Sequence, residues 1–235
     1  MNEHAEKPSL RVVALAVSGV IYALWLIRIT DDMFALELYR WGICPRELSR
    51  LTGLLLGPLI HGSTVHLFVN TLPLFVLGTA IVYVYPRSAR IAIPVMVLGS
   101  GIGVWLFGRA TYHIGASGLA HGLIFFLFAM GVLRRDRPSM ALSMLVFFLY
   151  GGMVWSIFPQ EPGVSFESHF FGGVIGLALA FVLRHHDPAP PEKKYDWEGR
   201  RRGRSRDRRS VAGTVVQLDR CLKQIERQPA SSPLP

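Results

Sequence analysis

The feature that most constrains this chain is a set of six long stretches without Asp, Glu, Lys or Arg. They cover residues 12–27, 51–86, 91–108, 110–133, 138–160 and 168–183. A helix needs about 20 mostly apolar residues to cross the hydrocarbon core of a bilayer, and somewhat fewer when its ends reach the interface. Five of the stretches therefore have the length of a single membrane span.

The second stretch, at 36 residues, is too long for one span and too short for two spans with a turn. We interpret residues 61–85 as the span and residues 51–60 as a loop that lies partly in the bilayer. Such a loop requires the rest of the protein to satisfy its backbone hydrogen bonds. The sequence therefore predicts an all-α polytopic membrane protein. We expect a bundle of six transmembrane helices with a partly membrane-embedded first loop and a polar C-terminal tail.

The amino-acid composition excludes several classes of protein. Hydrophobic residues make up 51% of the chain and charged residues only 17%, whereas a soluble domain carries about 25% charged residues. Two cysteines cannot form a framework of disulfides. The composition thus excludes a secreted disulfide scaffold, a disordered protein and an ordinary soluble enzyme.

Lys and Arg are unevenly distributed between the two sides of the predicted membrane. On one side the short loops and the tail carry Arg87, Arg90, Arg134, Arg135, Arg137 and the cations from Arg184 onward. Of the connections on the other side, one carries only Arg109 and residues 159–167 carry none. Because cytoplasmic loops are enriched in Lys and Arg, we expect both termini to be cytoplasmic. Cys44 and Cys221 then lie on opposite sides of the membrane and cannot pair.

The first apolar stretch is expected to be an uncleaved span. The residues before it are not cleanly positive, and no small-residue cleavage site follows it, so it does not resemble a signal peptide. Nothing in it resembles a transit peptide either. We therefore expect an integral, multi-pass protein of the bacterial inner (cytoplasmic) membrane.

We expect three segments: a cytoplasmic N-terminal segment (1–9), the membrane domain (10–185) and a basic, largely disordered cytoplasmic tail (186–235). From residue 185 onward the chain has 12 Lys and Arg against 7 Asp and Glu. The run at 200–209 could bind anionic lipid or nucleic acid. We favour a solvated tail that helps to fix the topology, and expect no specific nucleic-acid partner. Apolar residues at helical spacing between 211 and 225 indicate a short amphipathic helix.

Ionisable side chains occur where a bilayer makes them costly. Five histidines lie in or beside the apolar stretches: His61, His66, His113, His121 and His169. Because burial in a bilayer is expensive, each of them indicates a functional position. His66 and Asn70 are four residues apart and share one helix face, as do Ser117 and His121.

Small residues recur every four positions on two of the predicted spans. They are Ser168, Gly172, Gly176 and Ala180 on the sixth span, and Gly118 and Gly122 on the fourth. Such stripes let helix backbones approach closely, and close packing by itself indicates no catalytic role. If these faces pack together, Ser117 and His169 meet near the extracytoplasmic surface, because each begins a helix that descends from that side.

A serine beside a histidine is the minimal arrangement for nucleophilic catalysis. A neutral imidazole can take the hydroxyl proton and later give it to the leaving amine. No Asp or Glu lies in these stretches, so the pair would be a dyad. The oxyanion requires hydrogen-bond donors. Candidates are the Ser117 N–H at a glycine-flanked helix start, the Asn70 amide and the His66 side chain.

Three segments resemble motifs of the rhomboid intramembrane serine proteases. The run His61–Asn70, HGSTVHLFVN, is similar to the H-x4-H-x3-N pattern of that family. Gly115-Ala-Ser117-Gly118 resembles its G-x-S-G motif, and the segment from His169 to Gly176 resembles its H-x2-G-x3-G pattern. The motifs occur in the order and on the helices expected for the family, and the resemblance covers residues 10–184.

The resemblance implies roles for individual residues. Ser117 would be the nucleophile and His169 the general base and acid. Asn70, His66 and the Ser117 amide would form the oxyanion hole. The substrate would be a transmembrane segment of another protein, cut near the outer face of the membrane.

Further residues are expected to support the site without carrying out the chemistry. Gly115 and Gly118 flank the nucleophile, and His61 is expected to brace the first loop by hydrogen bonds. His121 stands where the family often has an aromatic residue that packs on the catalytic imidazole. We expect it to pack there rather than to hydrogen-bond His169 or relay protons. A Trp-Arg pair found in the first loop of many members is absent from residues 51–60, which leaves the anchoring of that loop open.

Hydrolysis requires water, so we expect the site to lie in a polar depression open to the outside. The bulky fifth span, which has no polar catalytic residue, could border an access path from the lipid. Residues 159–167, rich in turn formers, are a candidate for a mobile cap. A helical substrate must unwind before attack, so we expect Gly, Pro or other weak helix formers near the cut and small side chains at it.

Other functions remain open at this point. The principal alternative is a catalytically inactive rhomboid-like protein that binds transmembrane helices, and the presence of both Ser117 and His169 argues against it. A transporter or proton channel could use the histidines as a relay, but such proteins often carry intramembrane Asp or Glu. A metalloprotease would need a motif such as H-E-x-x-H, which does not occur, so we expect no metal and no cofactor.

Overall fold

The computed structural model describes residues 9–159 and 163–188, which belong to one compact unit of the chain. Several expectations lie outside the described residues. They concern the N-terminal segment up to residue 8, the basic run at 200–209, the amphipathic helix between 211 and 225, and Cys221.

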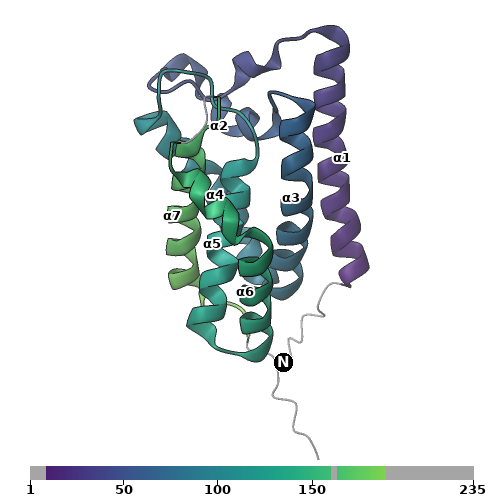
Figure 1. The fold of residues 1–235 in the computed structure, drawn as a ribbon, viewed down its shortest axis with the longest axis vertical. Coiled ribbons are helices and arrows are strands. Elements are labelled where there is room, and N and C mark those ends of the chain that lie inside the picture. The colour runs from purple at the N-terminus through teal and green to yellow at the C-terminus, as the bar shows by residue number, and fades with distance from the viewer. Residues whose placement is uncertain (1–8, 160–162, 189–235) are drawn as a thin grey trace, which may run out of the picture. The chain divides into compact units, whose positions relative to one another are not determined.

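Six helical segments in the described part of the chain are long and apolar enough to cross a membrane (Figure 1). They are α1 (Leu10–Phe34), α3 (Thr64–Val84), α4 (Pro86–Phe107), α5 (Ser117–Arg134), α6 (Arg137–Tyr150) with its 3₁₀ continuation η4 (Gly151–Ile157), and α7 (Phe166–Leu183). No strand occurs among these residues, only an isolated bridge between Ile43 and His113. The predicted all-α bundle of six transmembrane helices is confirmed.

The first helix is longer than the charge-free stretch that predicted it. It continues past residue 27 to Phe34 because Arg28 forms ion pairs with Asp31 and Asp32 one turn further on. Opposite charges three and four residues apart stabilise a helix. The Arg28 guanidinium also donates to the His61 carbonyl at 2.8 Å, which ties this end of α1 to the chain just before α3.

The connection between α1 and α3 is a series of short turns. They are η1 (Leu38–Trp41), η2 (Leu48–Arg50), α2 (Gly53–Leu56) and η3 (Gly57–Leu59). Ile43 and His113 exchange two backbone hydrogen bonds of 2.9 Å, and the Gly57 carbonyl accepts from the Gly115 N–H at 2.9 Å. Backbone outside a helix needs such partners if it lies within a bilayer. The same bonds hold this loop against the segment that leads into α5.

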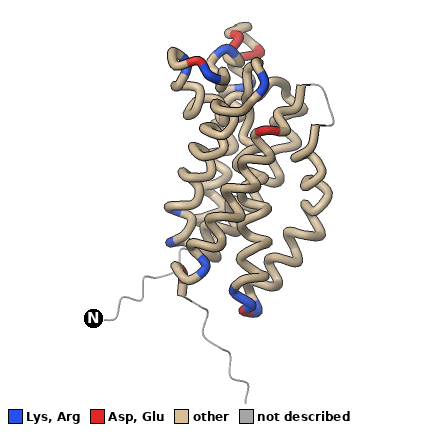
Figure 2. The backbone as a smooth tube through the Cα atoms, turned by 90° about the vertical axis from the view of Figure 1, so that its left-hand side faces the viewer, with Lys and Arg blue, Asp and Glu red and all other residues tan. Residues whose placement is uncertain are grey.

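The helix α5 lies at the centre of the bundle, where it packs against α3, α4, α6 and α7. Two thirds of its residues are buried, whereas α1 is at the edge and packs chiefly on α3 (Figure 1). Most charged residues gather at the two ends of the bundle and leave the middle of the helices free (Figure 2). That distribution is the one a protein needs if its middle faces hydrocarbon.

Glycines bring α5 and α7 into backbone contact. A Cβ on Gly172 would overlap the Gly118 carbonyl oxygen, and a Cβ on Gly176 would overlap the Gly122 carbonyl oxygen. Side chains larger than hydrogen are therefore excluded at both positions, as in other close helix crossings in membranes. This packing, which the sequence predicted, places the first residues of α5 and α7 side by side.

The opposite end of the bundle is held by a buried carboxylate just after α7. The Asp187 side chain accepts hydrogen bonds from the backbone N–H groups of Arg87 and Ser88, at 2.9 and 3.0 Å, in the first turn of α4. A negative charge is favourable at a helix N-terminus, where backbone donors have no partner within the helix. Arg134, near the end of α5, donates to the carbonyls of Arg184 and Asp187. Three helices are thereby joined at this end.

We predict that Gly172→Ala destabilises the fold, because the added methyl group meets a backbone carbonyl that cannot move aside. Overpacking a core typically costs about 1–3 kcal/mol, and a backbone clash lies at the upper end of that range. The matched control is Gly19→Ala on α1, where no atom other than those of the adjoining helix backbone lies within 4 Å of the new methyl group. The measurement is thermal unfolding of both variants in detergent. Equal midpoints for the two variants would contradict the close crossing of α5 and α7.

Candidate active site

The turn before α5 requires glycine for two reasons. Gly115 has a φ of +106°, a backbone conformation that residues with a side chain rarely adopt. A Cβ at this position would also collide with the ring of His66. The turn thus holds Ser117 as the first residue of α5, with the His66 imidazole packed directly against Gly115.

Ser117 and His169 are within hydrogen-bonding distance. The Ser117 Oγ lies 2.9 Å from the His169 Nε2, and the two residues are only 7% and 6% exposed. The Nδ1 of the same ring lies 3.0 Å from the Ser156 carbonyl oxygen. A carbonyl only accepts, so Nδ1 carries the hydrogen and Nε2 is free to accept the Ser117 hydroxyl. This is the tautomer that a general base for Ser117 requires.

His121 packs face to face on His169. The ring centroids are 4.0 Å apart and the planes differ by 9°. Nδ1 of His121 lies 2.8 Å from the Ser117 carbonyl oxygen, and Nε2 lies 2.8 Å from the Ser156 Oγ and 3.2 Å from the Met153 carbonyl oxygen. The ring therefore packs on the imidazole, as the family's aromatic residue does, and it also contacts polar atoms on both sides.

Ser156, in η4, is a site residue that the sequence did not reveal. Its carbonyl contacts His169 and its hydroxyl contacts His121, although we expected no polar group of the fifth span to take part. A serine near the end of an apolar span is common, and a backbone carbonyl leaves no trace in a sequence. The only signal was that Ser156 falls within the last turns of a span otherwise bulky and apolar.

The expected oxyanion-hole residues lie on α3 beside the nucleophile turn. The Asn70 side-chain amide donates one hydrogen to the His66 carbonyl at 3.0 Å, which leaves its second hydrogen available. The His66 and His61 rings meet edge to face, with centroids 5.2 Å apart. Within the described residues, neither the Asn70 nor the His66 side chain hydrogen-bonds Ser117. The His66 ring lies against Gly115 in the turn before Ser117, and the oxyanion-hole role of both residues stays a prediction.

His61 accepts a hydrogen bond from the Ala116 N–H, the residue directly before the nucleophile, at 3.3 Å through its Nε2. Its own carbonyl accepts from Arg28. His61 therefore links the end of α1 to the turn that holds Ser117. The His61 ring thus braces the turn before Ser117. The expectation that it braces the first loop stays a prediction.

The sequence of this chain matches a known protein family over most of its length. The family model of the Rhomboid domain matches residues 45–186, which is more than half of the chain. The chain belongs to the rhomboid family.

Relatives of this rhomboid occur in mycobacteria. An uncharacterized protein of Mycobacterium tuberculosis is 31% identical over 202 residues, which cover 82% of each chain. An uncharacterized protein of Mycobacterium bovis matches to the same extent. A third, from Mycobacterium leprae, is 32% identical over 181 residues, or 73% of this chain and 69% of the relative. The similarity thus extends beyond the three motifs.

Arginine anchors the first loop of this rhomboid although the Trp-Arg pair of the family is absent. The Arg46 guanidinium donates to the Gly108 carbonyl at 3.1 Å, and its N–H donates to the Trp105 carbonyl at 2.9 Å. The Trp105 indole in turn donates to the Glu47 carbonyl at 3.2 Å. The loop is thereby fixed to the end of α4.

A carboxylate lies closer to the site than the sequence indicated. The helix α7 begins at Phe166, so Glu167 belongs to its first turn, two residues before His169. Glu167 is 5% exposed, and its carboxylate accepts from the Arg109 guanidinium at 2.6 and 3.1 Å. No hydrogen bond joins Glu167 to His169 among the described residues. The carboxylate pairs with Arg109, and His169 is oriented by a carbonyl.

His113 is a brace rather than a part of the site. Its ring lies 2.6 Å from the Ser165 hydroxyl and 3.0 Å from the Arg109 carbonyl. Arg109 also donates to the Val164 carbonyl at 2.8 Å. These contacts fasten the chain before α7 to the loop before α5, on the side where the nucleophile lies.

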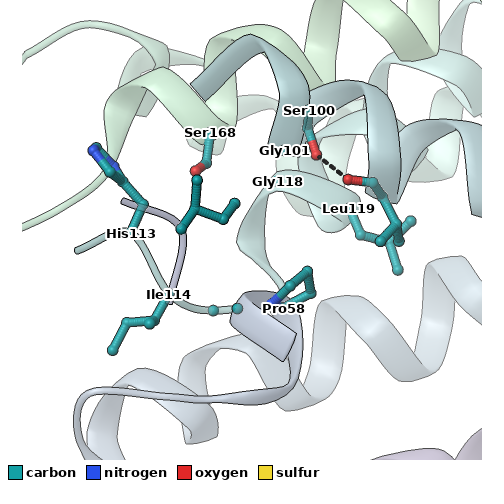
Figure 3. Close-up of a pocket in the computed structure, with 12 residues that line it drawn as sticks. Pro58, Ser100, Gly101, His113, Ile114, Gly118, Leu119 and Ser168 are labelled. Carbon is teal, nitrogen blue, oxygen red and sulfur yellow. Dashed lines mark hydrogen bonds between the residues drawn. The ribbon is translucent and has the colours of Figure 1, made fainter. Parts of the chain in front are cut away.

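A small cavity of about 10 Å³ lies beside the nucleophile turn (Figure 3). Its lining includes Pro58 of the first loop, Ser100 of α4, Gly118 of α5 and Ser168 of α7. That volume is at the lower limit for one water molecule. Neither Ser117 nor His169 lines this cavity, so the expected polar depression that opens to the outside stays a prediction. Among the described residues, no group of three or more His, Cys, Asp or Glu could hold a metal ion.

Proposed function

We propose that this rhomboid is an intramembrane serine endopeptidase that cleaves transmembrane segments of other membrane proteins by a Ser-His dyad. The observation that carries the proposal is the 2.9 Å distance between the Ser117 Oγ and the His169 Nε2, with Nδ1 held by a carbonyl. A neutral imidazole in this tautomer is the group that activates a serine hydroxyl. The rhomboid family contains intramembrane serine proteases and also inactive members, so the activity itself requires a direct test.

The reaction follows from these contacts. His169 Nε2 takes the hydroxyl proton as Ser117 Oγ attacks the peptide carbonyl carbon. The resulting imidazolium gives that proton to the leaving amine, and an acyl group remains on Ser117. A water molecule, deprotonated by His169, then attacks the acyl carbon and releases the second product.

Donors for the oxyanion are available around the nucleophile. The first N–H groups of a helix have no partner within it, and Ser117 is the first residue of α5. The free hydrogen of the Asn70 amide and the His66 ring lie on the neighbouring helix α3. Each donor aimed at the developing charge contributes about 2.7–4 kcal/mol to catalysis.

The substrate would approach from the lipid. Large apolar side chains of the fifth span are exposed on the outside of the bundle, namely Phe147, Phe148 and Trp155. A substrate in helical form keeps its carbonyls hydrogen-bonded, so it must unwind before Ser117 can attack. Substrates are therefore those with weak helix formers near the cut, and the scissile bond lies near the outer face of the membrane.

We predict that Ser117→Ala and His169→Ala each lower cleavage of a transmembrane substrate at least about 10⁴-fold, because both groups act in one reaction unit. A fluorophosphonate probe should label the wild-type protein and not Ser117→Ala. The matched control is Ser143→Ala on α6, a buried serine whose hydroxyl donates to the Phe128 carbonyl. Cleavage by purified Ser117→Ala would refute the dyad. Binding of transmembrane helices without any labelling would favour the inactive rhomboid-like alternative.

We predict that helix breakers in a substrate set its rate of cleavage. Replacing Gly near the cut by Leu should slow the reaction up to about 5-fold, and replacing Pro up to about 100-fold, as their helix propensities differ. The measurement is a comparison of initial rates at equal substrate density in liposomes. The same replacements ten or more residues away from the cut are the control, and unchanged rates at the near positions would contradict the requirement for unwinding.

We further propose that the protein lies in a bacterial cytoplasmic membrane with both termini, including the basic tail 186–235, in the cytoplasm. To test this, Cys44 and Cys221 are replaced by Ser, and single cysteines are introduced by Leu48→Cys in the first loop and Arg90→Cys in α4. Both positions are exposed in the structure. A membrane-impermeant maleimide added to intact cells should label only the Leu48→Cys protein. Labelling of the Arg90→Cys protein before lysis would reverse the orientation.

A further inference from the structure

Ser156 contacts both imidazoles of the site, although it belongs to neither of the helices that carry them. It lies in η4, which continues α6, whereas His121 is on α5 and His169 is on α7. Its carbonyl oxygen is 3.0 Å from the His169 Nδ1, and its Oγ is 2.8 Å from the His121 Nε2. A single residue of the fifth span therefore contacts polar side-chain atoms of both the fourth and the sixth span.

The carbonyl of Ser156 decides which nitrogen of His169 can act as the base. Because a carbonyl accepts only, it holds the hydrogen on Nδ1 and leaves the lone pair on Nε2 facing Ser117. Among the described residues, no other group hydrogen-bonds Nδ1. Without this contact the ring could rotate or adopt the other tautomer, and neither state accepts the Ser117 proton.

The hydroxyl of Ser156 acts on the second imidazole. Two carbonyl oxygens face the His121 ring: that of Ser117 lies 2.8 Å from Nδ1 and that of Met153 lies 3.2 Å from Nε2. A neutral ring has a single N–H, and the shorter contact places it on Nδ1, so Nε2 accepts from the Ser156 hydroxyl at 2.8 Å. The same hydroxyl lies 2.7 Å from the Met153 carbonyl, within η4 itself. The single hydroxyl hydrogen is shared between two acceptors. One is His121 Nε2 in the site, and the other is the Met153 carbonyl oxygen in η4.

These contacts form a closed circuit that begins and ends at Ser117. It runs from the Ser117 hydroxyl to His169, through Ser156 to His121, and back to the Ser117 carbonyl. Within this circuit the rings of His121 and His169 also pack face to face, with their centroids 4.0 Å apart. Three helical segments are joined at the reacting atoms by a single loop of hydrogen bonds.

The segment η4 is less firmly attached than the helix that it continues. None of its seven residues is fully buried, whereas α6 buries four of its residues. It is also a 3₁₀ segment, a form that is unusual beyond three or four residues and often marks a hinge. Gly152 has open space where a side chain would be. The polar contacts of Ser156 hold η4 against α5 and α7 together with Met153, which packs against the hydrophobic core.

We propose that Ser156 is a positioning residue that assembles the catalytic pair only while η4 is docked. The inference rests on the proposed protease function and adds a regulatory element to that site. When η4 is docked, the Ser156 carbonyl orients His169 and its hydroxyl orients His121. When η4 moves outward, both contacts break, the hydroxyl returns to the Met153 carbonyl, and His169 loses the partner that fixes its tautomer.

The test uses three substitutions that separate the hydroxyl from the size of the side chain. Ser156→Thr keeps the hydroxyl, Ser156→Val has the shape of threonine without it, and Ser156→Ala is smaller than serine. The readout is the rate at which a fluorophosphonate labels Ser117 in the full-length protein, because a small probe reports activation of the nucleophile without a transmembrane substrate. We expect Ser156→Ala and Ser156→Val to lower that rate about 10- to 100-fold, the range for misplaced catalytic groups. Ser156→Thr should stay within about 3-fold of wild type, since its hydrogen bond persists.

A second measurement asks whether Ser156 and His121 act through one contact. His121→Phe keeps a flat ring over His169 but removes the polar contacts of the histidine with Ser117, Met153 and Ser156. If the hydroxyl acts through His121, Ser156→Ala should have little further effect in the His121→Phe background, because coupled positions are not additive. Ser143→Ala, which removes a buried hydroxyl on the same span away from the site, is the control and should leave the labelling rate of both backgrounds unchanged.

The outcomes are distinguishable. If the wild-type protein is not labelled at Ser117, the protease proposal fails and takes this inference with it. If the wild-type protein is labelled and Ser156→Ala is labelled at the same rate, only this inference is overturned. It is also overturned if Ser156→Ala and His121→Phe multiply their effects as independent changes do. Loss with Ala and Val, retention with Thr and non-additivity with His121→Phe together support it.

Discussion

The close approach of α5 and α7 is the constraint on which the rest of the structure depends. Gly118 lies against Gly172 and Gly122 against Gly176, with no room for a methyl group at the crossing. Two helices that meet at backbone distance and descend from the same side have their first turns at the same depth. Ser117 and His169 occupy those first turns. The proximity of the Ser117 hydroxyl and the His169 imidazole therefore results from the crossing of α5 and α7. The loops before these helices set the exact positions of the two side chains.

The site is held by uncharged groups, which suits its location. A carboxylate beside the base would be expensive to bury in a bilayer and would need a partner of opposite charge. Among the residues that the structure describes, Glu167 is a carboxylate near the site, and it pairs with Arg109 and fastens a loop. The Ser156 carbonyl orients His169 by accepting a hydrogen bond from Nδ1, which fixes the tautomer of the ring without adding a charge. The Ser117–His169 pair and the Ser156 carbonyl thus form a hydrogen-bonded arrangement that buries no additional charge.

Much of this architecture could be predicted from the sequence, because the bilayer makes charge-free stretches and small-residue stripes informative. The six spans, the α5–α7 crossing and the nearness of Ser117 to His169 follow from such patterns. The length of α1 and the position of Glu167 do not, because each depends on a partner: Asp31 and Asp32 for Arg28, and Arg109 for Glu167. Arg109 and Glu167 are 58 residues apart, so no local pattern links them. The role of Ser156 could not be predicted, because it contacts His169 through its backbone carbonyl, which every residue type has.

If the protein cuts transmembrane helices as proposed, it has to admit a helix and also keep Ser117 and His169 aligned. In this rhomboid the two requirements meet at η4, which carries Trp155 on its exposed side and Ser156 on the side of the site. A movement of η4 large enough to admit a substrate would also release His169. The base would then regain its orientation only after η4, or the substrate itself, restored a carbonyl at Nδ1. An unwound substrate carries unpaired carbonyls of its own. In the proposed protease, substrate unwinding and assembly of the Ser117–His169 pair would then be coupled through the hydrogen bond at Nδ1.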